Sequence, residues 1–267
     1  VFSRDRPMQL HAFLSSVERH VSDLYRPLVV LYRPTGRGFA DAYAHLRGEF
    51  PEVEWREQGR SFRPDLRACL GEEPHVAFHT DDDVFFAGAG DVTPREDEVC
   101  FSLRLGENTS YCYPLDTVES LRDPVVAGDR ISWDWRRQQP GAYAYPLAVN
   151  GHVFRGGEAQ EWLGTIDYRN PNELEAGLQT LGDAVRPRMA AFRHSRVVSI
   201  PANRVNDAFP NRHWGRYDVE ELNERFLKGE RLDLDRMDFS AVVSCHQEIG
   251  FAFRSAPVAA KRPPERA

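Results

Sequence analysis

The chain of 267 residues carries 34 Lys and Arg against 41 Asp and Glu, which gives a formal net charge of -7 at pH 7. This length suffices to bury a large core, as one α/β domain or two small ones. The mixed charge argues against a dedicated nucleic-acid surface, which would show basic clustering, and no run of about 18 apolar residues exists to cross a bilayer. We therefore expect no nucleic-acid partner, no transmembrane segment, and a cytoplasmic protein or one peripheral at the inner membrane, with an anchor upstream of Val1 left open.

The four cysteines show no C-x-x-C spacing. Their positions, Cys69, Cys100, Cys112 and Cys245, favour neither a zinc knuckle nor a disulfide framework. Reduced thiols are the expectation, which agrees with a cytoplasmic location.

Strand and helix signals alternate over the first hundred residues. Pro7 suits a first helical turn, and apolar residues follow from Leu10 at i, i+3, i+4 and i+7 spacing. Repeated units of this kind favour an α/β fold with a mostly parallel central sheet flanked by helices, in which ligands bind at the carboxyl ends of the strands. The expected strands lie at 1–2, 28–32, 53–56 and 76–78, and the expected helices at 7–17, 39–46 and 64–70.

The second half of the chain gives a more mixed pattern. Segment 131–146 is predicted to be a loop, because its four aromatic residues lie among Gln, Arg, Pro and Gly; they either stack on sugar rings or pack back onto the domain. Asn172 and Glu175 fit a capping box at the start of a helix, which favours a structural role for Glu175. The other expected elements are strands at 99–105, 149–154 and 241–245 and helices at 157–163 and from Asp218 to Gly229.

Three consecutive aspartates, Asp81, Asp82 and Asp83, follow directly on the apolar run at 76–78. In an extended segment, side chains at i and i+2 point the same way, so we expect Asp81 and Asp83 to converge on one hard cation while Asp82 points elsewhere. The apolar continuation at 84–86 argues against a solvated acidic loop, although a surface turn at a strand end is an alternative.

Three short motifs stand at the ends of expected strands: Phe-Ser-Arg-Asp-Arg-Pro at 2–7, Arg-Ser-Phe-Arg at 60–63 and Thr-Asp-Asp-Asp at 80–83. Their order and placement resemble the GT-A glycosyltransferases, which combine a nucleotide-binding βα half with a D-x-D metal motif. The resemblance covers most of the chain and includes both the family-2 type and the exostosin-like enzymes, whose stereochemical outcomes differ. It implies a single domain over 1–257, with a donor half at 1–95 and an acceptor half at 96–257. The tail at 258–267, with its Lys-Arg-Pro-Pro run, is expected to be disordered.

The resemblance also implies a metal-dependent transfer of a sugar from a nucleotide-sugar donor, with a UDP-sugar favoured, to a carbohydrate or other hydroxyl acceptor. A bound Mn²⁺ or Mg²⁺ would neutralise the charge that develops on the diphosphate leaving group. His246, which follows an expected strand late in the domain, is the candidate third metal ligand beside Asp81 and Asp83. The residues implied to bind the donor are Phe2, Ser3, Arg4, Arg6, Arg63, Asp81 and Asp82.

Inverting transfer requires a carboxylate that takes the proton of the acceptor hydroxyl. Glu158 and Glu161 lie beside glycines just after an expected strand, and Glu173 lies about where the family places its late acidic motif. These three glutamates are equal candidates for the base, with surface or capping roles as the alternative.

Two other classes of protein stay open. A sugar nucleotidyltransferase would share the nucleotide-binding half, but it usually opens with a glycine-rich phosphate loop, and the segment at 3–7 has no glycine. A calcium-stabilised carbohydrate-binding protein would account for the aspartates and the aromatic residues but not for the βα units, since such modules are generally all-β.

Overall fold

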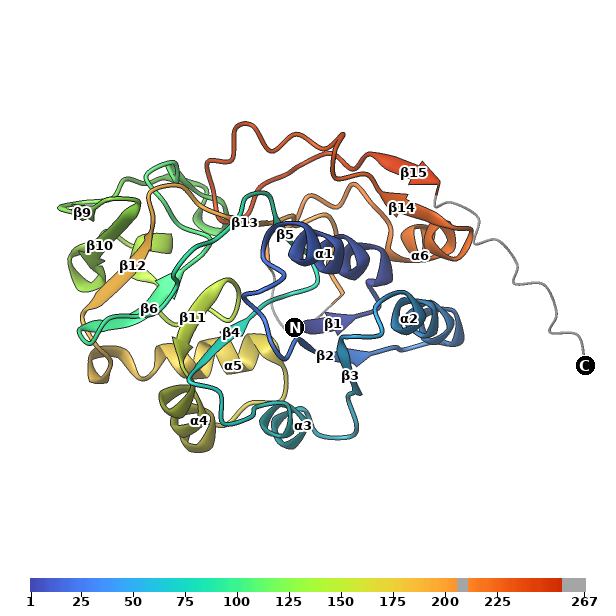
Figure 1. Cartoon of the computed structure of the whole chain (residues 1–267), viewed down its shortest axis with the longest axis horizontal. Coiled ribbons are helices and arrows are strands. Elements are labelled where there is room, and N and C mark those ends of the chain that lie inside the picture. The colour runs from blue at the N-terminus through green and yellow to red at the C-terminus, as the bar shows by residue number, and fades with distance from the viewer. Residues whose placement is uncertain (206–210, 256–267) are drawn as a thin grey trace, which may run out of the picture.

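Three parallel strands in the order β1-β2-β3 begin the fold and lie at the centre of Figure 1. The computed structural model describes residues 1–205 and 211–255, so the expected tail at 258–267 lies outside the described residues. The helices between these strands follow the predicted spacing: α2, for example, buries Phe39, Tyr43 and Leu46. The elements of this part are β1 (Phe2–Arg4), α1 (Pro7–His20), β2 (Val29–Arg33), α2 (Arg37–Glu49), β3 (Glu54–Glu57) and α3 (Phe62–Ala68).

A six-stranded mixed sheet forms most of the second half, in the order β4-β11-β6-β12-β10-β9. Only β6 and β12 pair in parallel, whereas the other four neighbours are antiparallel. The expectation of a mostly parallel central sheet is therefore wrong, and the observed class is α/β with a mixed sheet. The strands are β4 (His75–Phe78), β6 (Glu98–Ser102), β9 (Val125–Ala127), β10 (Arg130–Asp134), β11 (His152–Arg155) and β12 (Arg188–Phe192).

The two sheets meet where β1 passes the end of β4. Phe2 forms a parallel bridge with Thr80, since the Phe2 amide donates to the His79 carbonyl at 2.9 Å and the Asp81 amide donates to the Phe2 carbonyl at 3.1 Å. This contact aligns the carboxyl end of β1 with the aspartate turn. The remaining elements are β5 (Asp83–Phe85), β7 (Tyr111–Cys112), β8 (Thr117–Val118), α4 (Gly156–Thr165), α5 (Pro171–Gln179), β13 (Val197–Ser199), α6 (Val219–Leu227), β14 (Glu230–Leu232) and β15 (Phe253–Ser255).

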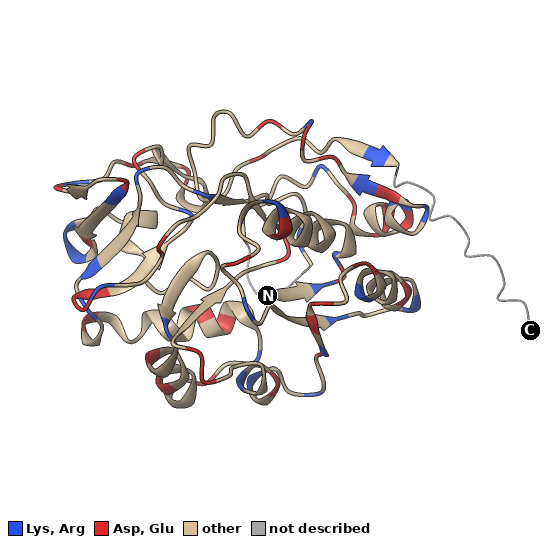
Figure 2. Ribbon diagram, in the orientation of Figure 1, with Lys and Arg blue, Asp and Glu red and all other residues tan. Residues whose placement is uncertain are grey.

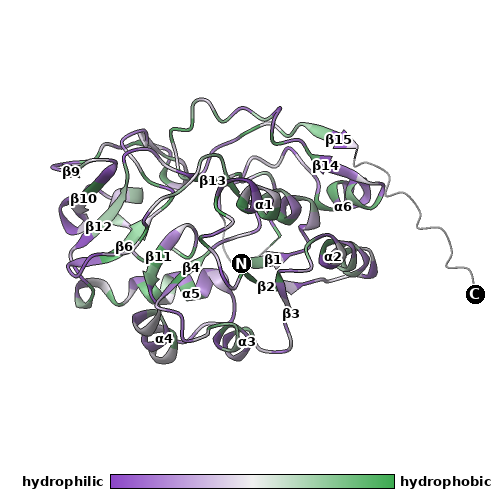
Figure 3. Ribbon diagram, viewed as in Figure 1, coloured by the Kyte–Doolittle hydropathy of each residue, from purple (hydrophilic) through white to green (hydrophobic). Residues whose placement is uncertain are grey.

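Two hydrophobic clusters occupy the two faces of this arrangement. Alternate residues of β2 separate between them: Val30 joins the cluster under α1, α2 and α6, and Leu31 joins the one over α3, α4 and α5. Interior strands such as β6 and β11 are correspondingly hydrophobic (Figure 3). Each cluster draws on both halves of the chain, because Phe13 and Phe101 belong to one cluster and Phe2 and Phe154 belong to the other.

Three local predictions differ from the structure. The first residues of segment 131–146 belong to strand β10, not to a loop, and Trp133 in this strand is fully buried. Burial is possible because the indole N–H donates a hydrogen bond to the Tyr143 carbonyl at 2.9 Å and so does not depend on water as an acceptor. Segment 241–245 is not a strand, although His246 beside it bridges Ser199. The cap of helix α5 lies two residues earlier than predicted, since Asn170, not Asn172, accepts the capping hydrogen bond.

Charged residues of both signs are scattered over the fold (Figure 2). Among the described residues, no helix combines the length and the apolar character needed to cross a membrane.

Candidate functional site

A cavity of about 890 Å³ lies where the two halves of the chain face each other. Its first wall consists of residues at or just beyond the carboxyl ends of parallel strands. Arg4 ends β1, Arg33 ends β2 and Gln58 follows β3. Thr80 continues this wall at the end of β4. The cavity thus occupies the position at which open α/β sheets bind their ligands.

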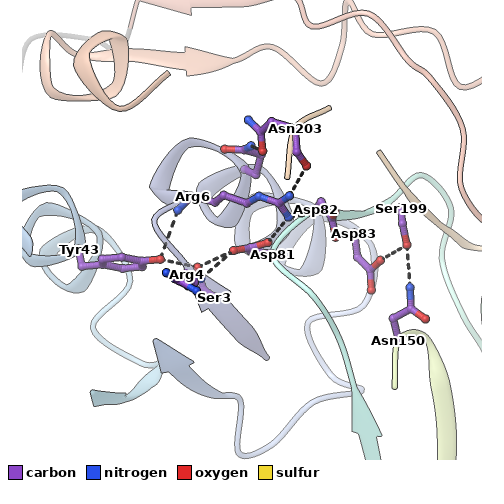
Figure 4. A network of polar contacts seen from close by, with 11 residues as sticks. Ser3, Arg4, Arg6, Tyr43, Asp81, Asp82, Asp83, Asn150, Ser199 and Asn203 are labelled. Carbon is purple, nitrogen blue, oxygen red and sulfur yellow. Dashed lines mark hydrogen bonds and ion pairs between the residues drawn. The ribbon is translucent and has the colours of Figure 1, made fainter. Parts of the chain in front are cut away.

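Asp81 is the centre of a buried polar network on this wall (Figure 4). One carboxylate oxygen accepts from Ser3 Oγ at 2.9 Å and from the Arg4 amide at 3.2 Å, and the other accepts from Arg6 Nη1 at 3.1 Å. Arg6 Nη1 also lies 3.1 Å from Asp82 Oδ2, and Nη2 donates to the Asn203 carbonyl. A single guanidinium therefore joins β1, the aspartate turn and the segment after β13.

Burial dominates the electrostatics of Asp81. Its carboxyl group is 3 % exposed, and burial raises its pKa to about 6 although Arg6 and Ser3 favour the charged form. The same network raises the pKa of Tyr43, chiefly through burial and then through the charge of Asp81. Removal of Arg6 would leave this carboxylate without its counter-charge.

Asp83 points away from the cavity, contrary to the prediction that it converges with Asp81. Its side chain is 1 % exposed and its oxygens accept from Ser199 Oγ and, at 2.8 Å, from His79 Nδ1. The extended spacing fails because residues 81–82 form a turn, closed by the Asp83 amide donating to the Thr80 carbonyl at 3.1 Å. Burial pushes the pKa of Asp83 upward, but the bonds from His79 and Ser199 outweigh it and hold the pKa below its usual value.

Asp82 takes the position that the prediction gave to Asp83. It lines the cavity, its side chain is 17 % exposed, and its Oδ2 contacts Arg6, whereas no described residue donates to its Oδ1. Among the described residues, no group of three or more His, Cys, Asp or Glu side chains is placed to hold a metal ion. Mg²⁺ usually keeps several waters and binds through one or two carboxylates and substrate phosphates, so a single free carboxylate oxygen fits it without such a group.

His246 lines the same cavity but contacts an arginine. Its Nδ1 lies 3.5 Å from Arg104 Nη2, and burial together with this neighbour lowers its pKa to about 3. Since a guanidinium only donates, Nδ1 is the acceptor and the neutral ring carries its proton on Nε2. Ligation of a cation through Nε2 would first require the loss of that proton, so the observed contact does not favour the predicted role as third ligand.

Most of the residues expected to bind the donor do line the cavity. Arg63 is the exception, because its guanidinium turns outward to Asp167 at 2.7 Å and to the Gly164 carbonyl at 2.8 Å. Its neighbour Phe62 lines the cavity instead. The predicted donor-binding residues that do line it are Phe2, Ser3, Arg4, Arg6, Asp81 and Asp82.

None of the three candidate bases lies in the cavity lining. Glu158 accepts from Arg186 at 2.6 Å, Glu161 is exposed on α4, and Glu173 pairs with Arg169 at 2.8 Å beside the cap of α5. Glu175, expected to be structural, does line the cavity, and its Oε1 accepts from the Val149 amide at 3.1 Å. Burial raises its pKa above the ordinary value, with Arg104 opposing.

The second wall holds the residues that sequence reasoning missed. Arg104 follows β6, Asn150 precedes β11, and Asn203 lies beyond β13, so no common local pattern marks them. Of the four aromatic residues at 131–146, Trp135 and Tyr145 line the cavity, while the other two are in the core. The cavity lining is rich in arginine: within the described part of the chain, eight arginines but only three carboxylates line the cavity.

Comparison of the sequence with models of known protein families and with curated proteins finds no match.

Proposed function

We propose that the protein is a glycosyltransferase that moves a sugar from a nucleotide-sugar donor, with a UDP-sugar favoured, to a hydroxyl acceptor with the help of Mn²⁺ or Mg²⁺. The observation that carries the proposal is the aspartate turn in a cavity rich in arginine at the carboxyl ends of β1 to β4. The strand order β3-β2-β1 continued by β4 supports it, since it places this turn beside the opening strand, as in the GT-A resemblance.

Unpartnered donors at the turn suit a diphosphate. Arg6 Nε and Asn203 Nδ2 are buried and find no hydrogen-bond acceptor in the part of the chain that the structure describes. Buried donors without acceptors are costly, and both residues line the cavity, so ligand oxygens are their natural partners. Phosphate oxygens offer several acceptors and a negative charge to such a site.

The cation of this proposal binds at Asp82. Asp82 would hold Mn²⁺ or Mg²⁺ through Oδ1 together with diphosphate oxygens, and the bound ion supplies charge neutralisation for the leaving group. Asp81 keeps Ser3, the Arg4 amide and Arg6 in place and thereby fixes the turn. Asp83 has no direct contact with the ion in this scheme, because both of its oxygens are used in the core.

Glu175 is the base of the proposed reaction. It is the one carboxylate among the described lining residues besides the aspartate turn, and its raised pKa suits a group that takes a proton near neutral pH. Trp135 and Tyr145, which also line the cavity, offer aromatic surface to the apolar face of an acceptor sugar.

Calorimetric titration with nucleoside diphosphates tests the proposal. UDP or GDP should bind more tightly when Mn²⁺ is present, and Asp82→Asn should remove that gain while a matched change outside the cavity, Glu161→Gln, leaves it intact. Failure of every nucleoside diphosphate to bind, with or without Mn²⁺, would contradict the proposed function.

A further inference from the structure

Arg104 is a buried cation at the cavity surface without a carboxylate partner. It is 8 % exposed, yet no carboxylate oxygen of a described residue lies within 4.0 Å of its nitrogens. Burial of a charge without compensation is costly, whereas the exposed Arg33 and Arg204 are solvated by water. The lining arginines that do have carboxylate partners are Arg4, Arg6, Arg136, Arg169 and Arg212.

A continuous chain of hydrogen bonds ties Arg104 to Asp83. Arg104 Nη1 donates to the side-chain and main-chain oxygens of Asn150, Asn150 Nδ2 donates to Ser199 Oγ at 3.0 Å, and Ser199 Oγ donates to Asp83. The Asp83 to Asn150 part is drawn in Figure 4. All four side chains are at most 8 % exposed.

The donor and acceptor groups of these side chains fix the direction of every hydrogen bond between Arg104 and Asp83. Because Arg104 can only donate, Asn150 must present its oxygen to Arg104 and its NH₂ to Ser199. The hydroxyl of Ser199 then accepts from Asn150 and uses its own proton for Asp83, which as a carboxylate only accepts. Asp83 accepts from Ser199 through one oxygen and from His79 through the other, so its ionised form satisfies both donors.

The aliphatic part of the Arg104 side chain packs beside Gly151. Gly151, at φ +68°, packs so closely that an added Cβ would lie 3.4 Å from both Cβ and Cδ of Arg104 and 3.2 Å from Val197. Nη1 is committed to Asn150 and Nη2 lies 3.5 Å from His246 Nδ1, so Nε and the second proton of Nη2 are the donors left for a ligand in the cavity.

We propose that Asp83 is a positioning residue that, through Ser199 and Asn150, holds the guanidinium of Arg104 in place to bind an oxyanion of a ligand in the cavity. The oxyanion is a phosphate or a carboxylate, supplied either by the diphosphate of a donor or by an acidic group of an acceptor. The inference deepens the proposed function by naming a charged group of the substrate, but oxyanion binding does not depend on sugar transfer. It also gives Asp83 a role in ligand affinity without contact with a cation.

Binding of small anions in the presence of a chelator tests the inference apart from any metal. Inorganic pyrophosphate represents the donor diphosphate, glucuronate represents an acidic acceptor, and uridine is the uncharged control. Arg104→Met should weaken the preferred anion roughly tenfold to a hundredfold, the range for loss of a charge-assisted hydrogen bond. Asp83→Asn should weaken the same anion by about threefold to tenfold, because it keeps the shape of the side chain and removes only the charge.

A double-mutant comparison separates positioning from general structural damage. With Met at position 104, the change Asp83→Asn should have no further effect on anion affinity, and uridine affinity should stay the same in all variants. Arg33→Met, an exposed arginine of the same cavity, serves as the matched control and should cost at most about threefold.

The inference is overturned if wild type and Arg104→Met have equal affinity for both anions. It is also overturned if the effects of Asp83→Asn and Arg104→Met on anion affinity are additive. Loss of anion binding in Asp83→Asn that Arg104→Met does not share would equally contradict it. If the variants change anion affinity as expected but no sugar transfer is detected, the proposed function is refuted and the inference about Arg104 stands.

Discussion

The two walls of the cavity are built in different ways. The wall from the first half takes its side chains from the end of β1 and from the turn after β4, such as Ser3, Arg4 and Asp82. The opposite wall gathers Arg104 and Glu175 from segments that only the mixed sheet and α5 bring together. Strand ends therefore expose functional residues to sequence reasoning, whereas residues assembled by long-range packing stay hidden from it.

The largest expected effect concerns the second wall. Glu175→Gln should lower kcat for sugar transfer by about a hundredfold to ten-thousandfold, because a general base acts mainly in the transition state. Donor affinity should be unchanged. Since burial raises the pKa of Glu175, the acidic limb of the wild-type kcat profile should lie above the ordinary glutamate value of 4.5 and disappear in the variant.

The three glutamates outside the cavity are the matched controls for this prediction. Glu158→Gln, Glu161→Gln and Glu173→Gln should keep near-normal kcat, with at most about 1 kcal/mol lost from the free energy of unfolding where a cap or ion pair is removed. Normal turnover in Glu175→Gln would contradict the assignment and favour a retaining mechanism, in which the leaving phosphate itself takes the proton.

A similarly large effect on stability is expected at the first wall. Arg6→Met should lower the free energy of unfolding by about 3–5 kcal/mol, because it leaves the buried Asp81 carboxylate without its partner. Arg33→Met, which removes an exposed arginine of the same wall, should stay within about 0.5 kcal/mol. Urea unfolding measures both, and equal stability of the two variants would show that the Arg6 network does not hold the wall together.

A pH-dependent effect on stability is expected from the buried imidazole of His152, which also lines the cavity. Burial, together with Arg104, lowers its pKa from 6.5 to about 3, so below pH 6.5 the unfolded chain binds a proton that the native protein does not. Stability should therefore fall as the pH decreases from 6.5 toward 3, by roughly 1.4 kcal/mol per pH unit from this residue.

The variant His152→Asn isolates that contribution. Its amide can keep the hydrogen bond to the Pro146 carbonyl, which the imidazole makes at 3.1 Å, but it has no proton to bind. The difference in unfolding free energy between wild type and variant should move in favour of the variant on acidification. Asp81, with its pKa raised to about 6, has the opposite sign and stabilises the fold as pH falls from 6 toward 3.8, but it cancels in this difference. A difference independent of pH would refute the argument.

The smallest predicted effect concerns acceptor binding. Tyr145→Ala should raise KM for a sugar acceptor about twofold to tenfold with unchanged kcat, since a stacked ring contributes about 0.5–1.5 kcal/mol. Val118→Ala, an 87 % exposed side chain outside the cavity, is the control. Equal acceptor KM in both variants would exclude stacking on Tyr145.

The spacing of apolar residues predicted the helices and strands of the first half well, because these elements are determined by residues close together in the sequence. The apolar spacing of α1 and the strand before the aspartates need only neighbouring residues, and both occur as predicted. The orientation of Asp83 was missed because a two-residue turn rotates the chain, and alternation along a strand says nothing about such a turn. Trp133 was misassigned to a loop because its buried partner, the Tyr143 carbonyl, is supplied by packing.

The candidate base is a second example of a residue whose position the sequence could not predict. Glu173 lies in the first turn of α5, and Glu175 follows it by two residues. Only the fold decides that Glu173 turns to Arg169 while Glu175 reaches the Val149 amide at the cavity. Sequence reasoning named Glu158, Glu161 and Glu173 as equal candidates and expected Glu175 to be structural, because the sequence alone does not show which of these side chains faces the cavity.

Release of nucleoside diphosphate from a panel of UDP- and GDP-sugars in the presence of Mn²⁺ tests the central claim most directly. The account predicts slow hydrolysis of at least one donor by the wild-type protein, faster release when a hydroxyl acceptor is added, and loss of both in Asp82→Asn. Absence of release from every donor, or release that Asp82→Asn leaves unchanged, would contradict a nucleotide-sugar site in this cavity.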